Sequence, residues 1–300
     1  MNLHLDIRAE SAEEFSISAE GRDAAACGRM EGNLILETYR QILASEGREI
    51  VPLRLRVKNE IPLGMGCGSS AAARLAGIAL AVEFGPLGWC AEEIIAVATA
   101  LEGHPDNVSA CWVGGMTVSA VSPLSSSYAA ASLGASVDFP PVSVARLDVP
   151  PHWRPVLVLP RESVRTEESR KVLPDRYSRA DTVANLQHTA LLVAAFGSAN
   201  SSLLRFAMHD RLHQPYRSSI CPILNRLQGI SQAEGVLGIA LSGAGPGVLA
   251  IVEQSLKNEK LLGLLRTQLG DFKDVEVIHC SFENKGVMSD WATHLVSNVI

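Results

Sequence analysis

The segment from Pro62 to Ala72, with the sequence PLGMGCGSSAA, constrains the fold of this chain more than any other. It follows an alternating apolar run at 51–59 that predicts a strand, and it precedes an alanine-rich run at 69–84 that predicts a helix. Glycine occupies every second position from Gly64 to Gly68, which permits backbone angles and close approaches that a side chain would forbid. The chain must therefore pass from a sheet into a helix through a tight glycine turn.

A turn of this kind is suited to hold an anion. The start of the helix presents unpaired N–H groups and the positive end of the helix dipole, which together favour a phosphate. Ser69 or Ser70 can cap the helix, or its hydroxyl can contact a phosphate oxygen or a bound Mg²⁺. The alternative is a turn without a ligand, which glycine and serine also favour. The segment is neither a Walker A loop, since no lysine follows the last glycine, nor a GxGxxG fingerprint.

An acidic residue, Glu102, follows the next predicted helix, at 91–101. A carboxylate at the negative end of a helix is disfavoured by about 0.3–1 kcal/mol unless a cation lies nearby. Since Mg²⁺ prefers one or two carboxylates together with substrate phosphates, Glu102 and Ser70 suit a magnesium–nucleotide site. Taken alone, Glu102 is a solvated acid at a helix end.

The residues after Glu102 read GHPDN, and each has an ordinary structural interpretation. Gly103 ends the helix, and a proline holds His104 away from helical angles. Asp106 and Asn107 are typical of an Asx turn, and a lone histidine is more often a hydrogen-bonded turn residue than a catalyst.

The charge and cysteine patterns exclude several classes of protein. The 300 residues carry a net charge of −6 without any run of lysine and arginine, which argues against a nucleic-acid partner. Six scattered cysteines without a CxxC pair predict neither a zinc ribbon nor a disulfide framework. No apolar run reaches the roughly 18 residues that a bilayer span needs, and residues 1–10 carry charges where a signal peptide is apolar. We expect a soluble, cytoplasmic protein without a membrane partner.

The chain length suggests two domains, or one large one. A stretch rich in serine, alanine and glycine at 118–136, followed by two Pro-Pro pairs, places the junction near residue 150 and predicts domains at 1–150 and 151–300. Strands and helices are mixed in both halves without a regular βαβ rhythm, which favours an α+β fold. Further strands are predicted at 3–8, 14–18, 154–159, 235–241, 247–253 and 275–280, and further helices at 31–44, 178–196, 203–210 and 256–269.

Three segments in this order and at this spacing resemble the GHMP kinase superfamily: PLGMGCGSSAA at 62–72, EGHPDNVSACWVGG at 102–115 and LSGAGP at 241–246. The EGHPDN form is similar to the homoserine kinase branch, and the resemblance extends to TEESRKVLP at 166–174 and HQPYR at 213–217. It implies a two-domain α+β fold, with an N-terminal domain like ribosomal protein S5 domain 2 and a ferredoxin-like C-terminal domain.

The activity that the resemblance implies is ATP-dependent phosphorylation of L-homoserine to O-phospho-L-homoserine, a step of threonine biosynthesis, with Mg²⁺ as the metal. The superfamily also suggests a homodimer. The ATP phosphates would be bound by Pro62, Leu63, Gly64, Met65, Gly66, Cys67, Gly68, Ser69, Ser70, Ala71 and Ala72, and by a second glycine loop of Ser242, Gly243, Ala244 and Gly245.

The same resemblance assigns the remaining site residues. Ser70 and Glu102 would hold Mg²⁺ and, with Asn107, form the catalytic set. The homoserine pocket would be lined by His104, Asn107, Arg170 and Arg217. The arginines also make independent sense, because a planar guanidinium matches the carboxylate of an amino acid. Phosphoryl transfer needs mainly positioning and charge neutralisation, so no base is assigned, although Asp106 is the one nearby acid in the sequence that could serve.

The chain departs from the family pattern at two places. Cys67 stands where the family usually has leucine. Family members normally begin with a strand and a loop of the type PxSxANLGPGFD, and this chain starts at Met1 in what looks like the continuation of that strand. Roughly two dozen residues would then be missing, by analogy with loop and strand lengths. We expect that Met1 is an internal methionine of a longer protein, and an in-frame stop codon directly upstream would contradict this.

Two other functions remain open at this point. The chain could phosphorylate another small alcohol, such as mevalonate or a sugar, or it could be a non-catalytic nucleotide-binding sensor on the same scaffold. The two arginines favour a substrate with a carboxylate. Retention of Ser70 and Glu102 argues against the sensor, which has no need of a metal pair.

Overall fold

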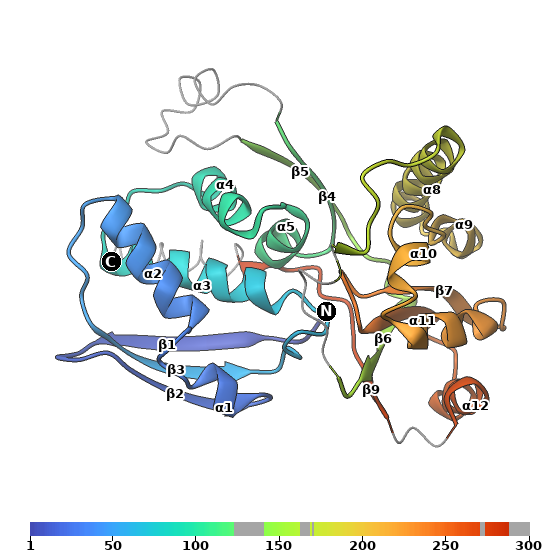
Figure 1. Cartoon of the computed structure of the whole chain (residues 1–300), viewed down its shortest axis with the longest axis horizontal. Coiled ribbons are helices and arrows are strands. Elements are labelled where there is room, and N and C mark those ends of the chain that lie inside the picture. The colour runs from blue at the N-terminus through green and yellow to red at the C-terminus, as the bar shows by residue number, and fades with distance from the viewer. Residues whose placement is uncertain (123–140, 163–168, 170, 271–273, 288–300) are drawn as a thin grey trace. The chain divides into compact units, whose positions relative to one another are not determined.

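The computed structural model describes residues 1–122, 141–162, 169, 171–270 and 274–287, and Figure 1 shows the course of the chain. The chain divides into two compact units, each made of three segments. The N-terminal unit comprises Leu3–Pro62, Gly68–Arg146 and Asn284–Ile300, and the C-terminal unit comprises Met1–Asn2, Leu63–Cys67 and Leu147–Glu283. The extents 1–150 and 151–300 therefore stay a prediction, and most of the predicted linker lies outside the described residues.

The N-terminal unit contains a mixed three-stranded sheet of order β1-β3-β2. Strand β3 (Leu53–Asn59) pairs antiparallel with β1 (Leu5–Ser11) and parallel with β2 (Ser16–Gly21). Every second residue of β3 is buried, as its alternating sequence predicts. The helices of the N-terminal unit are α1 (Ala24–Cys27), α2 (Leu34–Ser45), α3 (Ser69–Phe84), α4 (Ala91–Glu102) and α5 (Asp106–Val113). A two-stranded sheet pairs β4 (Met116–Val121) with β5 (Val142–Leu147).

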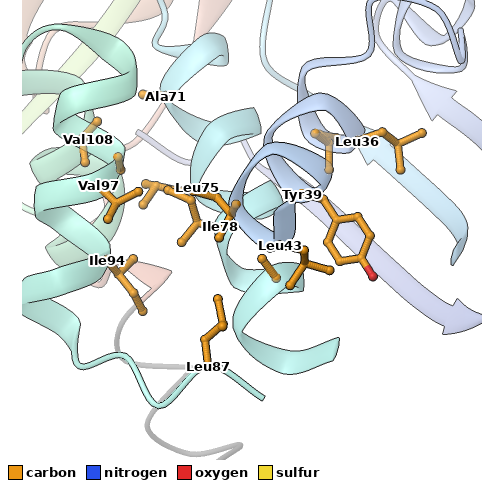
Figure 2. Close-up of a cluster of buried hydrophobic side chains, with 14 of the residues drawn as sticks. Leu36, Tyr39, Leu43, Ala71, Leu75, Ile78, Leu87, Ile94, Val97 and Val108 are labelled. Carbon is orange, nitrogen blue, oxygen red and sulfur yellow. The ribbon is translucent and has the colours of Figure 1, made fainter. Parts of the chain in front are cut away.

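The core of this unit holds α3 in place. Figure 2 shows apolar side chains of α2, α3, α4 and α5 meeting in one cluster, among them Tyr39, Leu75, Ile94 and Val108. A Cβ at Gly77 of α3 would lie 2.5 Å from the carbonyl oxygen of Ile35, so only glycine allows α2 to pack this closely. The N-terminus of α3, where the glycine turn ends, is thereby fixed.

The C-terminal unit contains an antiparallel four-stranded sheet of order β7-β8-β6-β9. Its strands are β6 (Trp153–Pro160), β7 (Val236–Leu241), β8 (Val248–Glu253) and β9 (Val275–His279). Its helices are α8 (Arg179–Gly197), α9 (Ser201–Ala207), α10 (Gln214–Arg217), α11 (Pro222–Leu227), the 3₁₀ turn η1 (Gln228–Ile230) and α12 (Asn258–Leu269). Side chains of α11 and α12 share a core with this sheet. The predicted α+β class is confirmed.

The largest local difference concerns residues 106–113, where no helix was predicted and the structure has helix α5 in place of the Asx turn that Asp106 and Asn107 suggest. Val108 and Trp112, one helical turn apart, are fully buried, and their burial stabilises a helix that the Pro-Asp-Asn sequence at its start conceals. The predicted helix at 203–210 begins earlier, at Ser201, because the side chain of Asn200 accepts hydrogen bonds from the first turn of α9. The helix ends at Ala207.

Two expectations from composition can be compared with the structure. No disulfide joins the six cysteines, all of which lie among the described residues. Within the part of the chain that the structure describes, no helix is both long and apolar enough to cross a bilayer.

Candidate active site

The glycine turn adopts left-handed backbone angles at all three of its glycines. At Gly66, with φ of +74°, a Cβ would lie 1.7 Å from the carbonyl oxygen of Ser242, so any side chain is excluded. The hydroxyl of Ser242 donates a hydrogen bond to the carbonyl oxygen of Gly66 at 3.0 Å. Residues 63–67 and the second glycine loop are therefore in direct backbone contact within the C-terminal unit.

The second glycine loop is tightly closed between β7 and β8. Ser242 N–H donates to the carbonyl oxygen of Gly247 at 2.8 Å, and Gly245 N–H donates to that of Ser242 at 2.9 Å. A Cβ at Gly243 would lie 2.8 Å from the carbonyl oxygen of Gly66. The thiol of Cys67 lies 3.9 Å from the Ser242 hydroxyl, so the cysteine fits beside the second glycine loop without a clash.

The second half of the turn leads into α3 in the N-terminal unit. Gly68 caps the helix with φ of +78°, and Ser69 is the first helical residue. A Cβ at Gly68 would make an ordinary contact of 3.6 Å with the side-chain oxygen of Asn107, near the start of α5. The N-termini of two helices, α3 and α5, thus come together beside Gly68, and both direct partial positive charge to this place.

Three side chains meet where α4 ends. Ser70 Oγ donates to Glu102 Oε2 at 2.8 Å, and Arg74 Nε donates to the same oxygen at 2.9 Å. The side chain of Glu102 is only 11% exposed and that of Arg74 is 23% exposed. The interpretation of Glu102 as a solvated acid is therefore wrong. Arg74 was not predicted as a site residue, although its position four residues after Ser70 places both on one face of α3.

His104 and Asp106 form a second polar pair beside Asn107. Nδ1 of His104 contacts Oδ1 of Asp106, and the same oxygen accepts a hydrogen bond from Asn107 N–H at 2.6 Å. The side chain of Asp106 is 74% exposed. Its contacts suit a role in orienting His104 better than a role as a base.

Of the two arginines predicted to bind the substrate, the structure describes only Arg217. Arg170 lies outside the described residues. Arg217 is the last residue of α10, and its Nε donates to the carbonyl oxygen of Ser169 at 3.1 Å, which fixes the side chain within the C-terminal unit.

Asp210, which sequence analysis did not select, shapes the turn before α10. Its carboxylate accepts hydrogen bonds from N–H groups of Leu212, His213 and Gln214 at 3.0, 2.9 and 2.5 Å. Burial raises the pKa of this acid, but the hydrogen bonds from the His213 side chain and from the three backbone groups outweigh it, and the pKa lies well below its usual range.

Ser70 and Glu102 suit a magnesium ion whose remaining ligands come from a nucleotide. Both offer the hard oxygen donors that Mg²⁺ prefers, and they already lie within hydrogen-bonding distance of each other. Among the described residues, no group of three or more histidine, cysteine, aspartate or glutamate side chains could hold a metal by itself. Such a donor set matches an ion that takes most of its ligands from phosphates and water.

Two family profiles match the chain. The profile described as GHMP kinases N terminal domain matches residues 33–115, and that described as GHMP kinases C terminal matches residues 191–267. The first range contains most of the predicted ATP-binding residues and Glu102, and the second contains Arg217 and the second glycine loop.

Relatives of known function match over most of their length. The homoserine kinase of Solibacter usitatus is 36% identical over 286 residues, which cover 95% of this chain and 88% of that protein. The homoserine kinase of Thermus thermophilus is 38% identical over 256 residues, which cover 84% of this chain and 79% of that protein.

Solved structures share the fold. The crystal structure of homoserine kinase from Cytophaga hutchinsonii superposes with a TM-score of 0.71 at 20% identity, covering 94% of this chain and 87% of that one. A Streptococcus pneumoniae phosphomevalonate kinase, solved with phosphomevalonate and AMPPNP, gives a TM-score of 0.60 at 13% identity, covering 92% of this chain and 90% of that one. At these identities the likeness speaks for the fold alone.

Proposed function

Because this chain belongs to the homoserine kinases of the GHMP kinase family, it transfers a phosphoryl group from ATP to homoserine, and we propose which of its residues carry that transfer. The observation that supports the assignment most is the 2.8 Å hydrogen bond between Ser70 and Glu102, which joins the start of α3 to the end of α4 at the glycine turn.

We assign the ATP phosphates to residues 62–72 and to the loop of Ser242, Gly243 and Gly245. Three features of the residues support this: the positive φ angles of Gly64, Gly66 and Gly68, the positive end of α3, and the second loop that braces residues 65 and 66. Substitution of Gly66 by any other residue would push the two loops apart.

Ser70 and Glu102 would hold Mg²⁺, which, when bound, neutralises charge on the transferring phosphoryl group. The carboxylate supplies the negative charge, and the hydroxyl supplies a neutral oxygen. Because Glu102 lies at the end of α4, a cation there also relieves the unfavourable interaction with the helix dipole.

Homoserine would be positioned by Arg217 and Arg170 at its carboxylate and by His104 and Asn107 elsewhere. Arg217 is held by a hydrogen bond to the Ser169 carbonyl, and His104 by Asp106. In the transfer, the homoserine hydroxyl oxygen forms a bond to the γ-phosphorus, the bond to the leaving ADP oxygen breaks, and the hydroxyl proton is released. Positioning and charge neutralisation account for most of the acceleration in such reactions, so a strong base is not required.

An assay of ADP release with L-homoserine, mevalonate and galactose as separate acceptors tests the function. We expect turnover with homoserine and none above background with the other two. Turnover of mevalonate or galactose but not homoserine would contradict the substrate, and calorimetric binding of an ATP analogue without any phosphoryl transfer would favour a nucleotide sensor. A homodimer, a cytoplasmic location and the domain extents 1–150 and 151–300 stay predictions.

A further inference from the structure

Arg74 occupies an unexpected place beside the proposed metal ligands. It follows Ser70 by one helical turn of α3, and both side chains donate to one oxygen, Oε2, of Glu102. Among the described residues, no hydrogen bond reaches the other carboxylate oxygen, Oε1. The carboxylate is therefore held by two donors at Oε2, whereas Oε1 accepts no hydrogen bond from the described residues.

The charge of Glu102 needs a partner within the fold. A carboxylate that is 11% exposed, at the negative end of α4, is costly unless a cation lies beside it. The guanidinium of Arg74, at 2.9 Å, supplies that cation from the protein itself. The group of Ser70, Arg74 and Glu102 then has no net charge.

We infer that Arg74 is a positioning residue that makes divalent-ion binding at Glu102 depend on the nucleotide. Its guanidinium holds the carboxylate against Ser70 and neutralises it, so a free ion gains little by binding there. The phosphates of ATP add the negative charge that the neutral group lacks. The ion therefore enters together with the nucleotide. This inference rests on the proposed role of Glu102 as a metal ligand.

The physical reason is Coulombic. A unit positive charge a few ångströms from a divalent ion repels it strongly in a partly buried site, and removal of that charge leaves the carboxylate available to the ion alone. Arg74→Met removes the charge and keeps an unbranched stem that suits a helix. Arg74→Lys keeps the charge and is the matched control.

The experiment is a titration of free Mn²⁺, followed by its electron paramagnetic resonance signal, with the full chain and without nucleotide. We expect Arg74→Met to bind Mn²⁺ at least about tenfold more tightly than the unsubstituted protein, and Arg74→Lys to bind it as weakly as the unsubstituted protein. Arg74→Gln, a second neutral variant, replaces Arg74→Met if circular dichroism shows that the latter is unfolded. Unchanged or weaker Mn²⁺ binding by the folded neutral variant would overturn the inference.

The failure of the inference can be separated from failure of the metal site. Addition of an ATP analogue should produce tight Mn²⁺ binding by the unsubstituted protein, and Glu102→Gln should remove it. If Glu102→Gln leaves nucleotide-dependent Mn²⁺ binding intact, the proposed metal ligand is wrong. If Glu102→Gln abolishes it while the neutral Arg74 variants behave like the unsubstituted protein, only the role of Arg74 is wrong.

Discussion

Two carboxylates, Glu102 and Asp210, are both largely buried, yet their partners differ in kind. Glu102, at the end of α4 in the N-terminal unit, accepts hydrogen bonds from the side chains of Ser70 and Arg74. Asp210, before α10 in the C-terminal unit, accepts hydrogen bonds from three backbone N–H groups and, in addition, lies 3.5 Å from Nδ1 of His213. Their side chains are 11% and 19% exposed, so burial alone does not separate them.

The kind of partner separates a carboxylate that can bind a ligand from one that holds a turn. Backbone donors are fixed by the course of the chain, so a carboxylate that accepts from them defines a turn and is not available to a ligand. Side-chain donors can rotate away and can be replaced, so a carboxylate held only by them can exchange a partner for an ion. By this criterion we propose that Glu102 takes part in the reaction and that Asp210 stabilises the fold.

The largest expected effect is that of Glu102→Gln. Because the variant removes the charge that the proposed ion needs, kcat should fall by about 100-fold or more, while the thermal stability stays near that of the unsubstituted protein. Steady-state kinetics and a thermal melt would measure both. Glu92→Gln, at an exposed position of the same helix, is the control and should leave both unchanged. Near-normal kcat for Glu102→Gln would show that Glu102, like Asp210, is not needed for the reaction.

Arg217→Ala tests the proposed contact of Arg217 with homoserine. Arg217 is the last residue of α10, which follows the turn at Asp210. Loss of the guanidinium should raise KM for homoserine by about 10- to 100-fold and change kcat less, because a charged hydrogen bond contributes about 1.5–3 kcal/mol. Arg179→Ala, an exposed arginine at the start of α8, serves as control. An equal loss of kcat and no change in KM would place Arg217 elsewhere in the reaction.

Asp210→Asn should act on stability first. The amide accepts the backbone hydrogen bonds less strongly than the carboxylate, so the free energy of unfolding should fall by about 1–3 kcal/mol, with a small rise in KM through Arg217. Urea unfolding would measure the first effect. The matched variant Asp175→Asn, at an exposed position of the same unit, should change neither quantity. A loss of kcat as large as that of Glu102→Gln would show that Asp210 also takes part in the reaction.

The smallest effect is a pH dependence. The pKa of Asp210 is depressed in the folded chain, so its contribution to stability is complete above the usual aspartate pKa of about 4 and is lost as the pH falls toward the folded value. The difference in unfolding free energy between the unsubstituted protein and Asp210→Asn should therefore be constant near neutral pH and shrink below about pH 4. A difference that grows on acidification would contradict the depressed pKa.

The sequence predicts the surroundings of Glu102 better than those of Asp210. The pairing of Ser70 with Glu102 follows from the strand–turn–helix pattern, the helix-end position of the acid and the ligand preference of Mg²⁺, and the structure brings the two side chains together. Arg74 was missed, because an arginine in an alanine-rich helix has no local feature that distinguishes a buried ion pair from a solvated side chain.

The remaining gaps depend on contacts between residues distant in sequence or on locally ambiguous patterns. Most partners of Asp210 are backbone N–H groups of an irregular turn, and the residue types of the turn do not predict this backbone geometry. Helix α5 begins with Pro-Asp-Asn, which is equally typical of a turn, and the burial of Val108 and Trp112 decides between the two. Strands and long helices with clear periodicity, such as β3 and α3, were placed almost to the residue.

Calorimetric binding of a non-hydrolysable ATP analogue, with and without Mg²⁺, to the unsubstituted protein and to Glu102→Gln tests whether Glu102 holds the ion. We expect Mg²⁺ to tighten binding by at least about tenfold for the unsubstituted protein and to have no effect on the variant. Equal tightening by Mg²⁺ in both proteins would show that the carboxylate beside Ser70 does not hold the ion.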